Sequence, residues 1–329
     1  MTKNVVHTGA APNEAIPEVA EELNVPGVTL IQRGPCRTPE ALLAALHDAD
    51  VSICYHEPYT REVLANVPRL KAVIRTGVGV DTVDLDAASD YGIIVANFPD
   101  FCTREVANHA IVLMMACAKK VALFDRVLRR EGWNAARTHR VPMGAIHDQT
   151  LGLVAFGAIP RAAAKVAQAM DMRVIAYDPY VEPTVFQQAG VEQVSLEELA
   201  ERSDYVSCHL PLNETTDRLL DRRFFARMKP TAYFINTGRG GVVAEADLIA
   251  ALESGQIAGA GLDVFESEPL AAGHPFLSMD QVVLTPHTAS YADETFATRD
   301  RRVGRTALAI LAGEIPQFVA NRTVLDKLK

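Results

Sequence analysis

Three polar residues with complementary chemistry each follow a short apolar run in the second half of this 329-residue chain: Arg239, Glu268 and His287. The apolar runs predict strands, and polar residues just beyond the carboxyl ends of parallel strands lie where open α/β sheets bind ligands. A guanidinium fork holds a carboxylate or carbonyl in fixed geometry, and an imidazolium can deliver a proton to a carbonyl oxygen. A glutamate beside the histidine would orient the ring and stabilise its protonated form. Together the three residues predict chemistry on a small 2-keto acid.

Each of these residues also has a structural interpretation. Arg239 could be a surface cation, Glu268 a helix-start acid before a proline, and His287 a buried histidine with satisfied hydrogen bonds. Any one of the three is more often structural, but the combination after three predicted strands favours catalysis. We therefore interpret them as the catalytic residues.

A degraded dinucleotide-binding motif lies upstream. The predicted strand Leu151–Phe156 leads into a turn that reads Ala155-x-Gly157-x-x-Pro160, so two of the three usual glycines are replaced. Gly157 occupies the middle position, where the backbone approaches a pyrophosphate most closely. Proline suits the first helical turn because the N–H that it lacks has no partner there. Ala155 is the harder replacement, since a Cβ atom restricts the tight turn.

Asp178 stands at the end of the next predicted strand, Arg173–Tyr177. A carboxylate at that place accepts hydrogen bonds from a ribose diol and repels a 2′-phosphate, which predicts NAD rather than NADP as the cofactor. The degraded motif leaves an alternative open. It is a strand–turn–helix without a ligand, in which Asp178 is a helix-capping or surface acid.

The chain alternates short β-branched runs with longer amphipathic ones, which is typical of parallel α/β sheets. A predicted helix from Thr103 to about Arg130 and a final helix, about Asp293–Ala312, flank the second block of strands. We interpret them as connectors between two lobes. Residues 1–102 plus 293–329 then form a substrate-binding lobe, and residues 103–292 form an NAD-binding lobe. The predicted fold class is α/β with two Rossmann-like lobes and parallel sheets, the first lobe flavodoxin-like and the second doubly wound.

Composition excludes several classes of protein. The net charge is −9 without a long run of lysine or arginine, so we expect neither nucleic acid nor a membrane as partner. The longest apolar stretch, Ala110–Ala118, is too short to span a bilayer, and the N-terminus lacks the apolar core of a signal peptide. The five cysteines form no CxxC pair and show no zinc-ligand spacing. We therefore expect no metal and a cytoplasmic location.

The chain resembles the D-isomer-specific 2-hydroxyacid dehydrogenase family across nearly its whole length. In that family an arginine, a glutamate and a histidine form the active site in this order, and they match Arg239, Glu268 and His287. The segment 75–81 resembles the family's substrate loop, whose backbone N–H groups bind the carboxylate. The substrate-binding residues implied there are Arg75, Val78 and Gly79. The run PDFCTREVANHA and the arginine at 75 most resemble the branch that includes the C-terminal binding protein corepressors.

The resemblance implies further contacts and a partner. The cofactor-binding residues would be Gly157, Ala158, Ile159, Asp178, Leu210, Pro211, Thr216, Thr237 and Asp263. A homodimer built through the second lobe is also implied, with Glu131–Gln149, a segment predicted to be irregular, as a crossing arm. Ser290 stands where many relatives of this branch carry tryptophan, which leaves the substrate open.

We therefore predict an NAD-dependent oxidoreductase that interconverts a small 2-keto acid and a D-2-hydroxy acid by hydride transfer. One alternative is an NAD(H)-sensing binding protein of the corepressor type, because those relatives also keep the three residues. The other alternative is a structural pseudoenzyme that lost its cofactor through the altered glycine turn.

Overall fold

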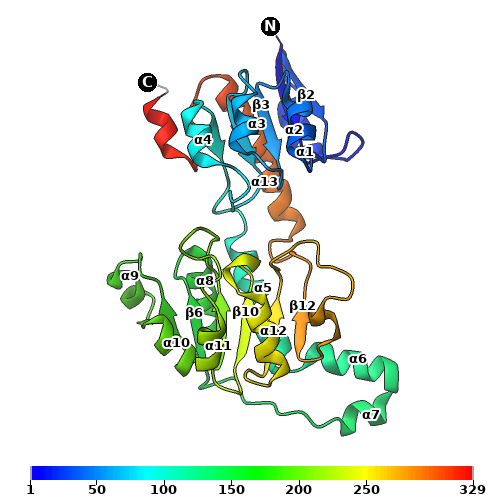
Figure 1. The fold of residues 1–329 in the computed structure, drawn as a ribbon, viewed down its shortest axis with the longest axis vertical. Helices are drawn as coiled ribbons and strands as arrows, with labels where there is room; N and C mark the ends of the chain where they lie inside the picture. The colour runs from blue at the N-terminus through cyan, green and yellow to red at the C-terminus, as the bar shows by residue number, and fades with distance from the viewer. Residues whose placement is uncertain (1, 328–329) are drawn as a thin grey trace. The chain divides into compact units, whose positions relative to one another are not determined.

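The computed structural model describes residues 2–327, which fold into two compact units. The first unit runs to Phe101 and resumes at Ala292, and the second comprises Cys102–Tyr291. Residues 1, 328 and 329, which the predicted first lobe includes, lie outside the described residues. Each unit is built on its own parallel sheet with helices on both faces (Figure 1). The predicted α/β fold class with two Rossmann-like lobes is confirmed.

The first unit is built from the following elements. Its strands are β1 (Lys3–His7), β2 (Val28–Gln32), β3 (Val51–Cys54), β4 (Ala72–Arg75) and β5 (Ile94–Ala96). Its helices are α1 (Pro17–Leu23), α2 (Pro39–Leu46), α3 (Arg61–Ala65), α4 (Leu85–Asp90), α13 (Asp293–Leu311) and the 3₁₀ turn η3 (Arg322–Asp326). The sheet order is β2-β1-β3-β4-β5, which is the flavodoxin-like order with a reversal between β1 and β3. Ligands bind such sheets beyond the carboxyl ends of the strands.

Two apolar layers enclose this sheet because its strands are apolar on both faces. Helices α2, α3 and α4 cover one face, and α1 and α13 cover the other. The end of the chain lies beside β5, where the Asn321 side chain accepts the Val95 N–H at 2.8 Å and donates to the Ile93 carbonyl at 2.9 Å. The C-terminal tail is therefore part of the first unit, and Figure 1 shows η3 next to α4.

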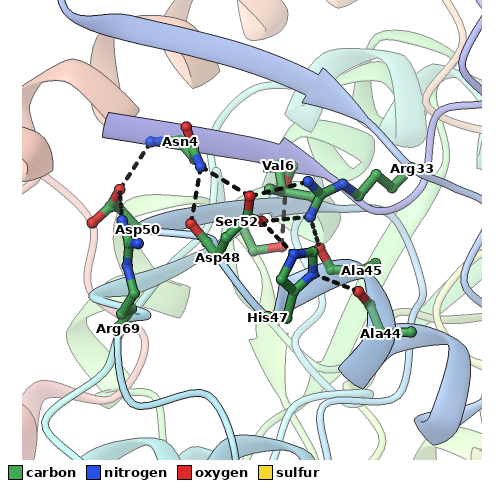
Figure 2. A network of polar contacts seen from close by, with 10 residues as sticks. All are labelled: Asn4, Val6, Arg33, Ala44, Ala45, His47, Asp48, Asp50, Ser52 and Arg69. Atoms are coloured by element: carbon green, nitrogen blue, oxygen red, sulfur yellow. Dashed lines mark hydrogen bonds and ion pairs between the residues drawn. The ribbon is translucent and has the colours of Figure 1, made fainter. Parts of the chain in front are cut away.

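A network of polar side chains closes the amino edge of this sheet (Figure 2). Asp48 accepts hydrogen bonds from Arg33 Nη1 at 2.6 Å and from Asn4 Nδ2 at 3.1 Å. Asp50 Oδ2 accepts the Asn4 backbone N–H at 2.9 Å and Arg69 Nη2 at 3.0 Å. These charges pair with one another, so the candidate chemistry of this unit lies at the opposite, carboxyl edge.

The second unit is built from more elements around a longer sheet. Its strands are β6 (Thr150–Val154), β7 (Arg173–Tyr177), β8 (Glu192–Gln193), β9 (Tyr205–Cys208), β10 (Tyr233–Asn236), β11 (Gly259–Leu262) and β12 (Val282–Leu284). Its helices are α5 (Thr103–Ala118), α6 (Val121–Glu131), α7 (Trp133–Thr138), α8 (Ala158–Ala169), α9 (Pro183–Gln188), α10 (Leu196–Arg202), α11 (Arg222–Arg227) and α12 (Glu245–Glu253), with 3₁₀ turns η1 (Gly240–Val242) and η2 (Pro275–Ser278). The order β12-β11-β10-β9-β6-β7-β8 is doubly wound, and its reversal lies between β6 and β9.

Helices again cover both faces of this sheet. Helices α5, α8 and α9 pack on one face, and α10, α11 and α12 pack on the other. Figure 1 shows α6 and α7 extending beyond the sheet instead of lying on it. Within residues 2–327, no helix has both the length and the apolarity that a membrane span requires.

The prediction of one continuous helix from Thr103 to about Arg130 is wrong. The structure has one helix before Lys120, α5, and a second helix after it, α6. Lys120 adopts a left-handed φ of 55°, so the chain leaves α5 and changes direction before α6 begins. Cys102 is the N-cap residue of α5, and no side chain caps that end. The predicted irregular segment Glu131–Gln149 contains one short helix, α7. The local sequence carries no signal for the break, since alanine and lysine are both good helix formers.

Candidate active site

The turn between β6 and α8 leaves an open helix N-terminus. Gly157 is the N-cap residue of α8 and is exposed, and a Cβ built on it would meet nothing within 4 Å. The first backbone bond of the helix is Arg161 N–H to the Gly157 carbonyl at 3.2 Å. Pro160 precedes that bond, so its missing N–H costs no helical hydrogen bond. The open space and the unbonded N–H groups of the first turn, which includes Ala158 and Ile159, fit a pyrophosphate.

Ala155 shows the strain that the sequence predicts for it. Its φ is 81°, in the left-handed region that side chains with a Cβ atom rarely adopt. Its N–H donates to the Tyr177 carbonyl at 2.8 Å, which ties the turn to the end of β7. The altered motif therefore keeps the backbone path of a glycine turn at an energetic cost.

Asp178 contributes to the same turn. Its Oδ2 accepts the Phe156 N–H at 2.9 Å, and its Oδ1 accepts the Tyr180 N–H at 2.9 Å. Each carboxylate oxygen has a further lone pair, so these bonds are compatible with an additional contact to a ribose hydroxyl. The sequence analysis did not foresee that Asp178 also positions the backbone next to Gly157.

Four other predicted cofactor residues lie beyond β9 and β10. Leu210, Thr216 and Thr237 are buried, whereas Pro211 is exposed. Thr216 Oγ1 donates to the Pro211 carbonyl at 2.6 Å, so its hydroxyl closes the loop after β9. A Cβ on Gly238 would lie 2.9 Å from the Leu210 carbonyl oxygen. The loops after β9 and β10 therefore pack on each other at the point where the sheet order reverses.

Asp263, another predicted cofactor residue, lies at the end of β11 and holds a neighbouring loop. Its side chain is fully buried, and its Oδ1 accepts the Thr285 hydroxyl at 2.5 Å and the Thr288 N–H at 2.8 Å. Its Oδ2 accepts the Ala289 N–H at 2.9 Å. His109 of α5 lies against the same group, with Nε2 at 2.9 Å from the Thr285 hydroxyl oxygen. Asp263 therefore holds the loop after β12, and its contact with the cofactor stays a prediction.

That loop carries His287 in a strained conformation. The φ of His287 is 55°, and its N–H donates to the Asp263 carbonyl at 2.8 Å. A left-handed residue that is not glycine persists where its surroundings determine the backbone, and such sites cluster at functional positions. The Asp263 carboxylate on the next two N–H groups supplies that support.

The structure brings His287 and Glu268 together from two different loops. His287 Nδ1 lies 2.7 Å from Glu268 Oε2, and both side chains are 36% exposed. Glu268 Oε1 accepts the Phe265 N–H at 3.1 Å, which fixes the carboxylate in its own loop. Because Nδ1 faces the carboxylate, Nε2 is the ring nitrogen that can exchange a proton with a bound molecule. This geometry suits a general acid–base pair.

Arg239 lies in the turn after β10, and the buried Asn236 side chain holds this turn. Asn236 Nδ2 donates to the Arg239 carbonyl at 3.0 Å, and its Oδ1 accepts the Gly238 N–H at 3.0 Å. A Cβ on Gly240 would lie 1.9 Å from the carbonyl group of Phe265. The Arg239 turn therefore packs directly on the loop that follows β11. Sequence reasoning assigned no role to Asn236, although an amide after a strand is a typical turn-forming residue.

The predicted substrate loop follows β4 in the first unit. Asn97 Nδ2 donates to the Val78 carbonyl at 2.7 Å, and the Phe98 N–H donates to the Gly77 carbonyl at 3.1 Å. A carbonyl and the N–H of the same trans peptide point in opposite directions. The N–H groups of Val78 and Gly79 therefore point away from Asn97 and Phe98, as an anion-binding turn requires. Asn97 is a positioning residue that the sequence analysis missed.

Arg75 lies over this loop and is largely buried. A Cβ on Gly77 would come within 2.7 Å of Arg75 Nη1, so the guanidinium lies directly against the backbone of this loop. Arg75 Nη2 lies 3.2 Å from His56 Nδ1, a neighbour that sequence reasoning did not identify. Burial raises the pKa of the nearby Glu57 carboxyl, an effect that the charge of Arg75 opposes.

Among residues 2–327, no group of three histidine, cysteine, aspartate or glutamate side chains is arranged to hold a metal ion. The groups of the second unit that can do chemistry are the helix N-terminus, the arginine and the histidine–glutamate pair. A doubly wound sheet with an open helix N-terminus at its first strand–helix turn is the arrangement that binds dinucleotide cofactors, which points to a dinucleotide-dependent enzyme.

Comparison with known proteins identifies the family. Residues 111–289 match "D-isomer specific 2-hydroxyacid dehydrogenase, NAD binding domain". The chain is 39% identical to a glyoxylate reductase of Korarchaeum cryptofilum over 84% of both proteins. It belongs to the D-isomer-specific 2-hydroxyacid dehydrogenase family and is an NAD(P)-dependent oxidoreductase.

Other relatives extend this comparison. A D-3-phosphoglycerate dehydrogenase of Methanocaldococcus jannaschii is 36% identical, and the match spans about half of that longer protein, 54%. The TT0316 protein from Thermus thermophilus has a TM-score of 0.87 at 33% identity, with 96% of this chain and 99% of that chain covered. A D-lactate dehydrogenase from Aquifex aeolicus, solved with NAD and lactic acid, has a TM-score of 0.85 at 25% identity, with 97% of this chain and 99% of that chain covered. The relatives whose names state an activity are a glyoxylate reductase, a D-3-phosphoglycerate dehydrogenase and a D-lactate dehydrogenase, so the predicted corepressor-like branch is not supported.

Proposed function

We propose that this chain is a glyoxylate-reductase-like enzyme that reduces a small 2-keto acid to the D-2-hydroxy acid. The observation that carries the proposal is the 2.7 Å contact between His287 and Glu268, on a loop that packs against the Arg239 turn. The identity to a named glyoxylate reductase supports the same substrate class. The proposal places the protein in the glyoxylate reductase branch instead of the corepressor-like branch.

The residues divide the work as follows. The N–H groups of Val78 and Gly79 bind the substrate carboxylate, and Arg75 adds positive charge beside them. Arg239 orients the keto acid through two-pronged hydrogen bonds. His287 donates a proton from Nε2 to the carbonyl oxygen, while Glu268 holds the ring through Nδ1. The bound nicotinamide cofactor supplies the hydride.

The cofactor site is assigned to the second unit. The first turn of α8, with Gly157, Ala158 and Ile159, binds the pyrophosphate. Asp178 binds the ribose diol and disfavours a 2′-phosphate, so NADH is the preferred reductant. Leu210, Pro211, Thr216 and Thr237 form the wall after β9 and β10, and Asp263 contacts the cofactor beside the His287 loop that it holds. The substrate-binding role of residues 1–102 plus 293–329 is part of the same proposal.

The cofactor assignment has a direct test. Asp178→Asn removes the negative charge, so kcat/KM with NADPH should rise relative to NADH. The ratio is the readout because the amide keeps only one of the two acceptors that bind the Phe156 and Tyr180 N–H groups. Glu182→Ala, an exposed acid nearby, is the matched control and should leave the ratio unchanged. Equal use of both cofactors by the unaltered protein would contradict the assignment.

The reaction itself is tested by a panel of 2-keto acids with NADH. Glyoxylate, hydroxypyruvate and pyruvate are the first compounds to measure, with the product's configuration determined by chiral chromatography. We expect turnover of at least one of them to the D-hydroxy acid. NADH binding without turnover of any keto acid would favour the NAD(H)-sensing alternative, and absence of NADH binding would favour the pseudoenzyme.

A homodimer is proposed through helices α5, α6 and α7. Several large apolar side chains of this region are exposed, namely Val112, Val121, Leu128, Trp133 and Met143. Large apolar side chains that are exposed on one chain are candidates for an interface, and a second copy would bury them. Light scattering should give a dimer for the unaltered chain and a monomer for Trp133→Asp, whereas Ile315→Asp, at an exposed apolar position of the first unit, should stay dimeric. A cytoplasmic location stays a prediction.

A further inference from the structure

A second histidine–glutamate pair lies behind the proposed catalytic one. His274 Nε2 is 3.1 Å from Glu245 Oε1, and the two side chains are only 16% and 15% exposed. Glu245 is the first residue of α12, and His274 precedes η2. Neither residue is part of the proposed substrate or cofactor site. Their position therefore needs another explanation.

Glu245 binds the loop that carries Glu268. Its second oxygen, Oε2, accepts the backbone N–H of Glu266 at 3.1 Å. The neighbouring Phe265 N–H is the group that donates to Glu268 Oε1 at 3.1 Å. Two carboxylates thus accept successive N–H groups of one short stretch. Glu268 accepts the N–H of Phe265, and Glu245 accepts the N–H of Glu266. Displacement of that backbone would displace the Glu268 carboxylate.

The same stretch is fixed from a second side. A Cβ on Gly240 would lie 1.9 Å from the Phe265 carbonyl group and 2.5 Å from the Glu266 nitrogen. The turn that carries Arg239 therefore prevents the Phe265–Glu266 backbone from moving towards Gly240. The hydrogen bond to Glu245 opposes movement of the same backbone away from Glu245. Close packing without a gap transmits such constraints because the interior is stiff.

His274 in turn fixes Glu245. His274 Nδ1 accepts the Phe276 N–H at 3.4 Å, so Nε2 carries the proton and donates to Glu245 Oε1. The His274 ring also packs on Phe276, with ring centroids 4.9 Å apart, and Phe276 is in the buried core. A hydrogen-bonded chain thus runs from the core through His274 and Glu245 to the loop of Glu268.

We infer that Glu245 and His274 are positioning residues for the reaction, because they hold the 265–268 backbone where Glu268 can orient His287. This inference rests on the proposed function of Glu268 and His287. A positioning role differs from a general stabilising role in one respect. Substitution of Glu245 or His274 should lower turnover only by displacing the Glu268 carboxylate.

A double-mutant cycle on the intact protein tests this route. We expect Glu245→Ala to lower kcat for keto-acid reduction by about tenfold, a fraction of the ~10²–10⁴-fold that a positioned general acid contributes. The KM for the keto acid and the Kd for NADH should change little. In the Glu268→Gln background the same substitution should cost less than about twofold, because interacting residues are non-additive. Glu253→Ala, at the exposed far end of α12, is the control and should leave kcat unchanged.

The outcomes separate the two proposals. Equal fold-losses from Glu245→Ala in both backgrounds would overturn the positioning role while leaving the proposed function intact. No effect of Glu268→Gln on kcat or on its pH profile would overturn the proposed function itself. Should Glu245→Ala fail to fold by circular dichroism, His274→Ala enters the same cycle with the same expectation, since it removes the donor that fixes Glu245.

Discussion

Two histidines at the carboxyl edge of the same sheet, His287 and His209, show how surroundings decide the role of a side chain. His287 is 36% exposed and faces a carboxylate at 2.7 Å. His209 follows β9, and its ring nitrogens lie 2.9 Å from the Ser207 hydroxyl and 3.5 Å from the Thr237 hydroxyl. Burial lowers the pKa of His209 to about 4, so it is neutral near pH 7.

The position of a histidine after a strand is therefore not sufficient for acid–base chemistry. A proton donor needs a partner that stabilises its charged form and access to the molecule that takes the proton. His287 is half-exposed and faces the Glu268 carboxylate, whereas His209 has hydrogen bonds that suit a neutral ring. The backbone differs as well, because His287 stands at a φ of 55° that the Asp263 network supports.

Replacement of the two histidines should break the comparison most clearly. His287→Ala should lower kcat by ~10²–10⁴-fold while NADH still binds, because the positioned proton donor is gone. His209→Gln keeps hydrogen-bonding groups for its hydroxyl neighbours and should retain most of the turnover. Steady-state kinetics with NADH fluorescence titration measure both effects. Near-normal turnover in His287→Ala would require another proton donor.

The next largest effect is expected from substitution of Asp263, whose carboxylate supports the turn that carries His287. Asp263→Asn puts an N–H₂ group where the carboxylate accepts two backbone N–H groups, which leaves a buried donor without an acceptor. We expect a loss of about 1–3 kcal/mol in the free energy of unfolding, together with a lower kcat. Asp204→Asn is the matched control, because Asp204 accepts the Thr150 N–H at 2.8 Å at the amino edge. The control should lose stability but not kcat, measured by urea unfolding and kinetics.

Acid stability should distinguish the neutral histidine from the catalytic one. A histidine with a folded pKa of about 4 takes up its proton near pH 6.5 only when the chain is unfolded. The stability that His209 contributes is therefore complete above pH 6.5 and falls as the pH drops towards 4, by up to about 3 kcal/mol. His209→Gln should flatten this part of the curve of unfolding free energy against pH. Burial and the charge of Arg299 lower the pKa of His7, in the first unit, to about 4. The stability that His7 contributes should therefore fall over the same pH range. An unchanged slope in His209→Gln would contradict the assignment.

The smallest expected effect concerns the other strained turn. Ala155 has a φ of 81°, and Ala155→Gly should raise the free energy of unfolding by about 1 kcal/mol, since glycine adopts this conformation without a steric penalty. Ala162→Gly in α8 should lower it by a similar amount, because glycine disfavours a helix interior. Thermal melting without cofactor compares the two variants. A lower melting temperature for Ala155→Gly would show that the turn is not strained.

Part of this protein is encoded in short stretches of sequence. The alternation of apolar runs with amphipathic segments identified the α/β class, because strand and helix periodicities are local properties. Turn chemistry correctly marked Pro160 as harmless and Ala155 as strained, since both effects depend on one residue's own backbone. The three residues Arg239, Glu268 and His287 were recognisable by type and by their place after strands.

Only the tertiary structure decided how those stretches meet. The 2.7 Å contact of Glu268 with His287, the enclosure of Asp263 and the hold of Asn97 on the Val78 carbonyl join different loops. Strand β8, two exposed polar residues, exists because it pairs with β7. Such contacts depend on strand order and register, which bring distant segments within hydrogen-bonding distance, and local periodicity carries no record of them.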